Sequence, residues 1–214
     1  MGVVTDHLGL FAEGARTTAV LTAVSFALAL VLGTVLASCR VSPVPPLRAA
    51  ATAYVEVVRN TPLTVLFVLF FFGFPKLGIR YPRFASAVIV LSAYTGAFVG
   101  EVLRSGINAV AAGQAEAARA LGLTFGQNLR LVVLPQAYRT VVAPLGGLLV
   151  ALIKNSSIAF VISVAELSFI ADQVNRDTAR PIPVFVGAAV CYLAMAIPTG
   201  LAVGALERRV AIRR

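Results

Sequence analysis

The sequence predicts an all-α integral membrane protein with about five transmembrane helices. The chain of 214 residues is 59% hydrophobic and 13% charged, whereas soluble domains carry about 25% charged residues. Its apolar residues form long blocks, and the stretches 17–39, 84–100 and 181–206 contain no charged side chain. Blocks of this length suit bilayer-spanning helices, because about 20 apolar residues cross the hydrocarbon core and a helix satisfies its own backbone hydrogen bonds there.

The first predicted span covers about 15–39. It is longer than the 7–15 apolar residues of a signal-peptide core, and no basic segment precedes it beyond Arg16, so we interpret it as a retained span. The remaining spans are predicted at about 51–74, 84–104, 137–163 and 182–206. With the polar segment 105–135, they form a single transmembrane domain covering residues 1–214.

Turn-forming residues separate the spans. The proline-rich stretch 42–46 follows the first span, 74–78 ends the second and 180–183 opens the fifth. Pro144 and Pro198 fall inside the last two spans, where each removes a backbone donor and kinks its helix. These kinks either shape the packing alone or help to form a curved gate.

The basic residues predict an orientation. With the N-terminus outside, 11 basic residues lie on the inner side and 6 on the outer side, leaving Lys154 within the fourth span. Cytoplasmic loops carry the excess of Lys and Arg, so this count favours an external N-terminus and a cytoplasmic C-terminus. The inner set is Arg40, Arg48, Arg59, Arg104, Arg119, Arg130, Arg139, Arg208, Arg209, Arg213 and Arg214, and the outer set is Arg16, Lys76, Arg80, Arg83, Arg176 and Arg180.

Several function classes are disfavoured. The chain has no HExxH or GxSxG motif, and neither of its lysines follows a glycine as a P-loop requires, so we expect no catalytic residue and no ATP site of its own. Cys39 and Cys191 lie far apart with no metal-ligand spacing, and His7 is the only histidine, so no metal or cofactor is expected. The net charge of +9 fits basic residues that flank spans and meet anionic lipid better than it fits nucleic-acid binding.

The polar segment 105–135 carries the most informative motif. Glu116-Ala117-Ala118 is followed by Gly122 and then by Leu134-Pro135, and this spacing resembles the cytoplasmic coupling loop of ABC importer permeases, with Val132 where that family has Ile. Residues 116–121 favour a helix, and Gly122 can end it in a left-handed conformation. The resemblance implies that a short helix containing Glu116, Ala117, Ala118, Leu121 and Gly122 docks on an ATPase subunit. The alternative is an amphipathic helix on the membrane surface.

A second motif narrows the family. Residues 54–63 read Tyr-Val-Glu-Val-Val-Arg-Asn-Thr-Pro-Leu, which is similar to the Y-x-E-x-x-R-[GN]-T-P-L signature of polar amino-acid permeases. Glu56 and Arg59 are spaced to pair on one helix face, and Thr61-Pro62 would kink the start of the second span. The pathway or gate candidates from this motif are Glu56, Arg59, Asn60, Thr61 and Pro62. An interfacial salt bridge followed by a turn would also explain them.

A third motif lies in the fourth span. Lys154-Asn155-Ser156-Ser157 resembles the K-[DN]-[ST]-[ST] stretch of the same family. A lysine at this depth is costly unless it is paired or faces water. Lys154 could therefore meet a carboxylate of the substrate, or act as a structural counter-ion to Glu56 or Glu101. Asn155, Ser156 and Glu101 complete the pathway candidates.

A fourth stretch, from Arg104 to Ala118, is similar to the R-x-G-I-x-x-V-x-x-G-Q-x-E-A-A run of this family. Three short segments look most like actinobacterial glutamate-uptake permease subunits: Val-Ser-Pro at 41–43, Arg-Asn-Thr-Pro-Leu at 59–63 and Arg-Ser-Gly-Ile-Asn at 104–108. The resemblance implies a type I ABC importer permease fold in the bacterial plasma membrane. It also implies that the protein imports polar amino acids, and in the narrower resemblance glutamate, by alternating access. The implied partners are ABC ATPase subunits, a second permease that is identical or related, and an extracellular substrate-binding protein. The alternative is a passive channel or scaffold subunit without ATP coupling.

Overall fold

The computed structural model describes residues 2–210, which are almost entirely helical and contain no strand. Arg213 and Arg214, counted above for the orientation, lie outside these residues. The elements in order are α1 (Gly2–Asp6), α2 (Leu8–Val41), α3 (Pro45–Asn60), α4 (Leu63–Val68), η1 (Leu69–Gly73), η2 (Phe74–Leu77), α5 (Arg83–Asn108), α6 (Ala112–Ala120), α7 (Phe125–Asn128), η3 (Leu129–Val133), α8 (Leu134–Asn155), η4 (Ser156–Ile162), α9 (Leu167–Thr178) and α10 (Pro181–Val210).

Four helical stretches are long and apolar enough to cross a membrane. They are Leu8–Val41, Arg83–Asn108, Gly126–Ile162 and Pro181–Arg209, and they contain the predicted first, third, fourth and fifth spans. A fifth crossing exists if the bent pair formed by Pro45–Asn60 and Leu63–Leu77 counts as one span. The prediction of about five apolar helices therefore holds, with the second span as the exception in shape.

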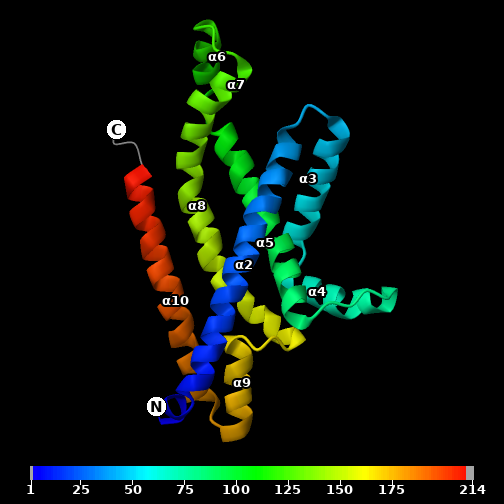
Figure 1. Cartoon of the computed structure of the whole chain (residues 1–214), viewed down its shortest axis with the longest axis vertical. Coiled ribbons are helices and arrows are strands. Elements are labelled where there is room, and N and C mark those ends of the chain that lie inside the picture. Colours follow the sequence, from blue (N-terminus) through cyan, green and yellow to red (C-terminus); the bar gives the residue numbers. More distant parts are fainter. Residues whose placement is uncertain (1, 211–214) are drawn as a thin grey trace.

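The second predicted span, 51–74, is not a single helix, and its kink lies further along than expected. α3 ends at Asn60, and the chain then turns by 107° into Leu63–Leu77. Thr61 is extended, with φ −97° and ψ 130°, because a residue before proline is pushed out of the helical region. The kink expected at the start of the span therefore lies inside it, and α4 to η2 run crosswise to the bundle (Figure 1).

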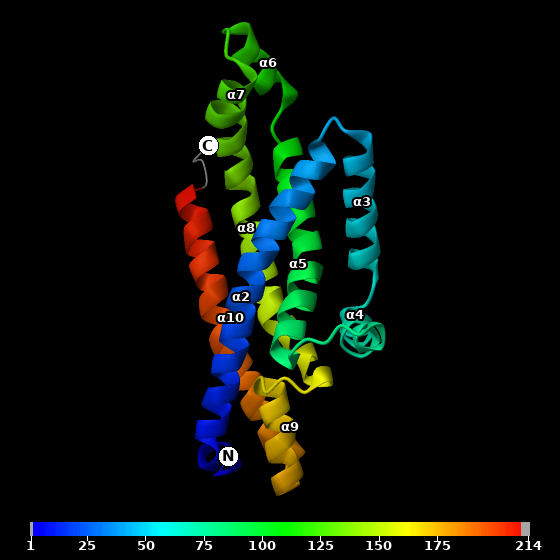
Figure 2. The ribbon, with the colours of Figure 1, turned by 45° about the vertical axis from the view of Figure 1, so that its right-hand side comes forward.

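The long helices run side by side and define two ends of the molecule. The N-terminus and α9 lie at one end, whereas the α6–α7 segment and the α2–α3 turn lie at the other (Figures 1 and 2). α10 runs from the α9 end toward the α6–α7 end. α9 was not predicted from the sequence, since its 12 residues are too few to span the bilayer.

Small residues let α2 and α5 approach closely. A Cβ added to Gly33 of α2 would lie 2.9 Å from the backbone nitrogen of Gly100 on α5, and one added to Gly96 would lie 2.9 Å from the side chain of Leu32. Gly96 and Gly100, two small residues four apart on α5, therefore pack against α2. Gly200 and Gly204 have the same spacing on α10 but make no such contact. A Cβ added to Gly200 would meet only Val150, at 4.0 Å, and one added to Gly204 would meet only Arg208 of its own helix.

We predict that Gly33→Ala destabilises the protein although alanine favours a helix. The new methyl group would press on the backbone of α5, and overpacking of this kind costs about 1–3 kcal/mol. The measurement is the thermal unfolding midpoint of the purified protein in detergent. Gly9→Ala is the matched control, because Gly9 lies in the same helix with nothing within 4 Å of an added Cβ. An equal or higher midpoint for Gly33→Ala than for Gly9→Ala would contradict the close packing.

Candidate functional site

The α6–α7 segment forms a compact protrusion at one end of the molecule. α6 ends in a Schellman motif, in which the Leu123 amide donates to the Ala118 carbonyl at 3.1 Å and the Gly122 amide donates to the Arg119 carbonyl at 2.9 Å. Gly122 has φ +83°, the left-handed conformation expected from the sequence. The chain therefore reverses sharply after the Glu-Ala-Ala helix.

A capping box starts the return from this protrusion. The Thr124 amide donates to Oε1 of Gln127 at 2.9 Å, and the Gln127 amide donates to Oγ1 of Thr124 at 3.4 Å. α7 then continues through the π-helix η3 into α8, and one helical stretch runs from Gly126 to Ile162. The protrusion is thus joined directly to the segment that carries Lys154.

The predicted coupling residues differ in accessibility. Glu116 and Ala117 are exposed, and Leu121, which follows α6, is 81% exposed. Ala118 is only 5% exposed. Of the two alanines expected in the docking helix, only Ala117 is accessible, because Ala118 packs inward.

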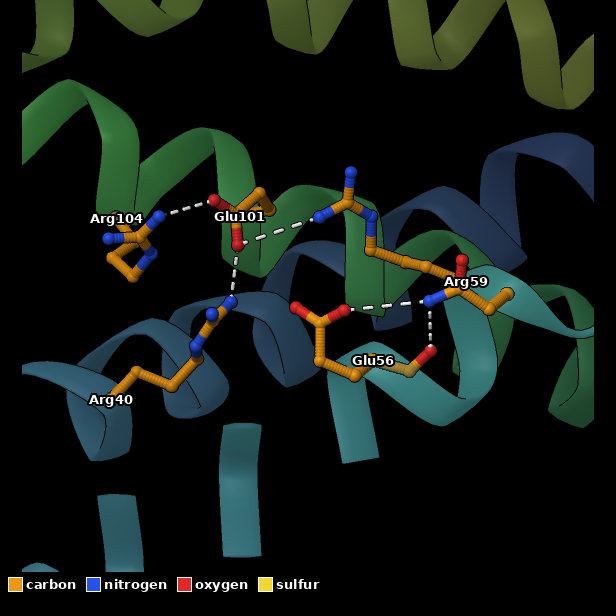
Figure 3. Close-up of polar contacts among 6 residues, drawn as sticks. Arg40, Glu56, Arg59, Glu101 and Arg104 are labelled. Atoms are coloured by element: carbon orange, nitrogen blue, oxygen red, sulfur yellow. Dashed lines mark hydrogen bonds and ion pairs between the residues drawn. The ribbon is translucent and has the colours of Figure 1, made fainter. Parts of the chain in front are cut away.

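Glu101 of α5 gathers three arginines from three helices (Figure 3). It accepts from Arg40 of α2, accepts at 2.5 Å from Arg104 of its own helix, and lies 3.6 Å from Arg59 of α3. The Arg59 guanidinium also lies over the Phe98 ring, 5.2 Å from its centroid. This arginine cluster ties α2, α3 and α5 together and keeps an excess of positive charge.

The predicted pair of Glu56 and Arg59 was wrong, because Arg59 reaches across to Glu101. Glu56 instead meets Asn60, whose Nδ2 donates to the Glu56 carbonyl at 2.8 Å and lies 3.5 Å from its Oε2. Thr61 donates to the carbonyl of Val57 at 2.7 Å. Together with Pro62, these contacts close α3 at the bend. The charge count above assigned Arg59 to the inner side of the membrane, and the structure places it in the last turn of α3, beside this bend.

Lys154 lies apart from these acidic residues. It is exposed on an open groove of about 400 Å³ between α8 and α10, lined also by Ser157, Ala189, Tyr192, Leu193 and Ala196. Among residues 2–210 no carboxylate lies within 4 Å of its ammonium group, so neither Glu56 nor Glu101 is its counter-ion. The volume falls in the range of small-molecule sites.

The two serines that follow Lys154 in the motif donate hydrogen bonds to backbone carbonyls. Ser156 is fully buried and donates to the carbonyl of Ile153 at 2.7 Å, while Ser157 donates to that of Lys154 at 2.7 Å. Asn155 is half-buried. The following segment η4 packs against α4, since Leu63 and Ile162 belong to one core cluster. The structure therefore brings the Thr61-Pro62 bend and the Lys154 motif to the same part of the bundle.

Comparison with known proteins identifies the family. Residues 29–212 match the family model described as "Binding-protein-dependent transport system inner membrane component". The chain belongs to this family of inner membrane transport components. The assignment agrees with the apolar helices described above, and the protein is a multi-pass membrane component.

Individual relatives of this transport component are amino-acid permeases. It is 36% identical over 209 residues to a probable glutamine ABC transporter permease protein of Bacillus subtilis, covering 98% of this chain and 97% of the relative. It is 42% identical over 199 residues to a glutamate transport system permease protein of Corynebacterium glutamicum, covering 87% of each chain.

Solved structures agree on the fold. An amino acid ABC transporter crystallised with histidines superposes with a TM-score of 0.92 at 32% identity, covering 96% of both chains. An inward-facing methionine ABC transporter gives a TM-score of 0.79 at 22% identity, covering 97% of this chain and 99% of the other. The transport component therefore has the type I ABC importer permease fold predicted from its sequence.

Sequence reasoning missed Glu166, which lies between η4 and α9 of this transport component. Glu166 is fully buried, and burial raises the pKa of its carboxyl above the ordinary value, although donors from Ser168, Phe169 and Tyr192 oppose that rise. Oε1 of Glu166 caps α9 by accepting from the Phe169 amide at 2.8 Å. No sequence pattern pointed to Glu166, because the helix that it caps, α9, was not predicted either.

We predict that Glu101→Gln destabilises this transport component, because three guanidinium groups would lose their shared carboxylate. Loss of an exposed ion pair costs about 1 kcal/mol of unfolding free energy, and breaking a buried pair costs about 3–5 kcal/mol. The Glu101 side chain is 23% exposed, so we expect a decrease between these two values. Thermal unfolding in detergent measures the change. Glu56→Gln is the control, because that exposed carboxylate makes no ion pair with a described residue. Equal midpoints for the two variants would exclude a stabilising role for the cluster.

Proposed function

We propose that this chain is the permease subunit of an ATP-driven ABC importer for polar amino acids, with glutamate as the specific substrate. The observation that carries the proposal is the α6–α7 protrusion, in which a Glu-Ala-Ala helix ends at left-handed Gly122 and presents Leu121 to solvent. The protrusion exposes both an apolar side chain, Leu121, and a carboxylate, Glu116, so it can offer a partner protein an apolar contact and a charged contact. The family assignment supports an ATPase as that partner.

The partners and the orientation follow from this role. We propose that two ATPase subunits bind and hydrolyse ATP, so the permease itself needs no cofactor and breaks no covalent bond. The ATPases act in the cytoplasm, which would place the protrusion there and the N-terminus and α9 outside. A binding protein would deliver the amino acid from the outer side. The basic-residue bias of the sequence supports this orientation.

A second permease, identical or related, would complete the pathway. Lys154 is exposed on an open groove within an apolar helix, and a lysine facing lipid at this depth is costly. The groove should therefore face water or another protein chain. The exposed apolar side chains of α10, such as Leu193, Ile197 and Leu201, offer the surrounding surface.

The mechanism we propose is alternating access. Closure of the ATPases on ATP would move the protrusion, and the helical stretch Gly126–Ile162 would carry that movement to Lys154. Leu63, the residue after the Thr61-Pro62 bend, shares a core cluster with Ala159 and Ile162 of η4, so the bend and η4 would shift together as a gate. The arginine cluster would keep α2, α3 and α5 in one body during this movement.

The substrate proposal rests on the charge of the groove. Lys154 has no carboxylate partner within 4 Å among the described residues, and an ammonium group in an apolar setting gains from a substrate carboxylate. The likeness to a glutamate transport system permease supports glutamate, while the likeness to a glutamine transporter permease supports the wider class of polar amino acids.

We predict that the tip of the protrusion can be cross-linked to the ATPase. In a variant lacking Cys39 and Cys191, Leu121→Cys should cross-link to a cysteine in the ATPase groove, because Leu121 is 81% exposed. Ala118→Cys is the matched control on the same turn, and its 5% exposure should prevent the reaction.

Glu116→Lys should lower uptake at least about tenfold while ATP hydrolysis continues, since the charge offered to the partner is reversed.

Absence of cross-linking at Leu121 in an assembled complex would reject both the docking and the cytoplasmic placement of the protrusion. Unchanged flux after Glu116→Lys, with no dependence on ATP, would instead favour the passive channel.

We predict that Lys154→Ala lowers glutamate uptake about tenfold without lowering the yield of assembled importer, because one charge-assisted contact is lost. Lys154→Arg should restore uptake only in part, since the planar guanidinium differs in reach and donor geometry. Radiolabelled glutamate uptake into reconstituted vesicles is the measurement. Lys76→Ala, at the only other lysine, is the control. Normal uptake by Lys154→Ala would disprove direct contact, and loss of assembly would make Lys154 a structural residue.

A further inference from the structure

Glu166 is a fully buried carboxylate outside every site described so far. It lies between η4 and α9, with 0% of the residue exposed. Among residues 2–210, no lysine or arginine lies within 4 Å of its oxygens. An acidic side chain in such a place is costly unless neutral donors satisfy it.

Those donors come from two different helices. On Oε1, Glu166 accepts from the Phe169 amide at 2.8 Å at the start of α9, where the positive end of the helix dipole favours a carboxylate. On Oε2, it accepts from the Tyr192 hydroxyl of α10 at 2.5 Å. The Ser168 hydroxyl lies 3.0 Å from the same tyrosine oxygen. The network therefore joins α9 to α10.

α2 belongs to the same network. The amide of Leu167, the residue after Glu166, donates to Oγ1 of Thr18 at 3.2 Å, and Thr18 is fully buried. Leu167 and Phe11 of α2 also share a core cluster with Val184 of α10. The backbone next to Glu166 is thus held against α2, so the carboxylate has a fixed position from which to hold Tyr192.

Tyr192 connects this buried network to the Lys154 groove. Its side chain packs against the core cluster near α9 and also lines the groove beside Lys154 and Ser157. The other lining residues of α10 are Ala189, Leu193 and Ala196, whose side chains carry no hydrogen-bonding group. Among the lining residues of α10, Tyr192 is therefore the one whose side chain a hydrogen bond can hold in place.

We infer that Glu166 is a positioning residue for the groove: it holds Tyr192 of α10 opposite Lys154 of α8, and so sets the width in which the substrate lies. This inference rests on the proposed function, because it assigns the groove to the transported amino acid. The Phe169 amide holds one oxygen of the carboxyl group, so the other oxygen accepts from the Tyr192 hydroxyl at a fixed position.

The test uses the assembled importer in vesicles with two variants that each remove the hydrogen bond donated by Tyr192 to Glu166. Tyr192→Phe keeps the ring in the groove but loses the hydroxyl. Glu166→Gln keeps an acceptor for the Phe169 amide but replaces the oxygen that accepts from Tyr192 with an amide nitrogen, which cannot accept. Each should raise the glutamate concentration for half-maximal uptake about tenfold while the maximal rate changes less than about twofold. The double variant should be no worse than either single variant, because both remove one interaction.

A second readout follows the groove itself. Ser157→Cys, in a background without Cys39 and Cys191, reports the access of a small thiol reagent to the groove wall. Tyr192→Phe and Glu166→Gln should each change the labelling rate of this thiol at least about threefold. Thr199→Val is the matched control on α10, since the Thr199 hydroxyl bonds only within its own helix, to the Met195 carbonyl. It should leave both the labelling rate and the uptake curve unchanged.

The outcomes separate this inference from the proposed function. If Lys154→Ala lowers uptake but Tyr192→Phe and Glu166→Gln change neither the half-saturating concentration nor the thiol labelling in the groove, the positioning role is wrong. Suppose instead that the two variants lower only the complex yield and the maximal rate, while Thr199→Val lowers neither. Glu166 is then a structural residue, and the inference also fails. Normal uptake by Lys154→Ala would overturn the proposed substrate role instead.

Discussion

The close approach of α2 and α5 is the contact on which the rest of the bundle depends. Gly33 and Gly100 bring the two backbones together, and the other elements are arranged around this pair. Because lipid gives no hydrophobic drive for helices to associate, close packing of small residues supplies the attraction. At one end of this pair the arginine cluster adds α3, and near the other end Thr18 of α2 fixes the chain before α9.

The protein treats its buried charges in two different ways. Glu101 is balanced by arginines from three helices, which ties those helices together and leaves the carboxylate partly exposed. Glu166 is fully buried and is satisfied by neutral donors at a helix start. Lys154, by contrast, is exposed and has no acidic partner within 4 Å among the described residues.

One helical stretch physically connects the two regions of interest. The Schellman motif at Gly122 and the capping box at Thr124 give the protrusion a defined shape, and Gly126–Ile162 leads from it to Lys154. A rigid protrusion at one end of such a helix can transmit displacement, whereas a flexible loop would absorb it. The interruptions at η3 and Pro144 mark the points where this helix can bend.

The class of the protein, its family resemblance and the shape of the protrusion could be predicted from the sequence. These follow from local properties: the length of the apolar blocks fixes the spans, and Gly122 after a run of helix formers fixes the turn. Thr61-Pro62 predicted a kink, but its angle of 107° and its place inside the second span could not be predicted in this way. The same is true of the α9 helix and of the burial of Ala118. The pairing of charges was also wrong, since Glu56 and Arg59 are well spaced along the chain yet Arg59 reaches Glu101 on another helix. Such pairs depend on the tertiary structure, because the energy of a charge depends on which groups replace the water around it, and those groups come from distant parts of the sequence.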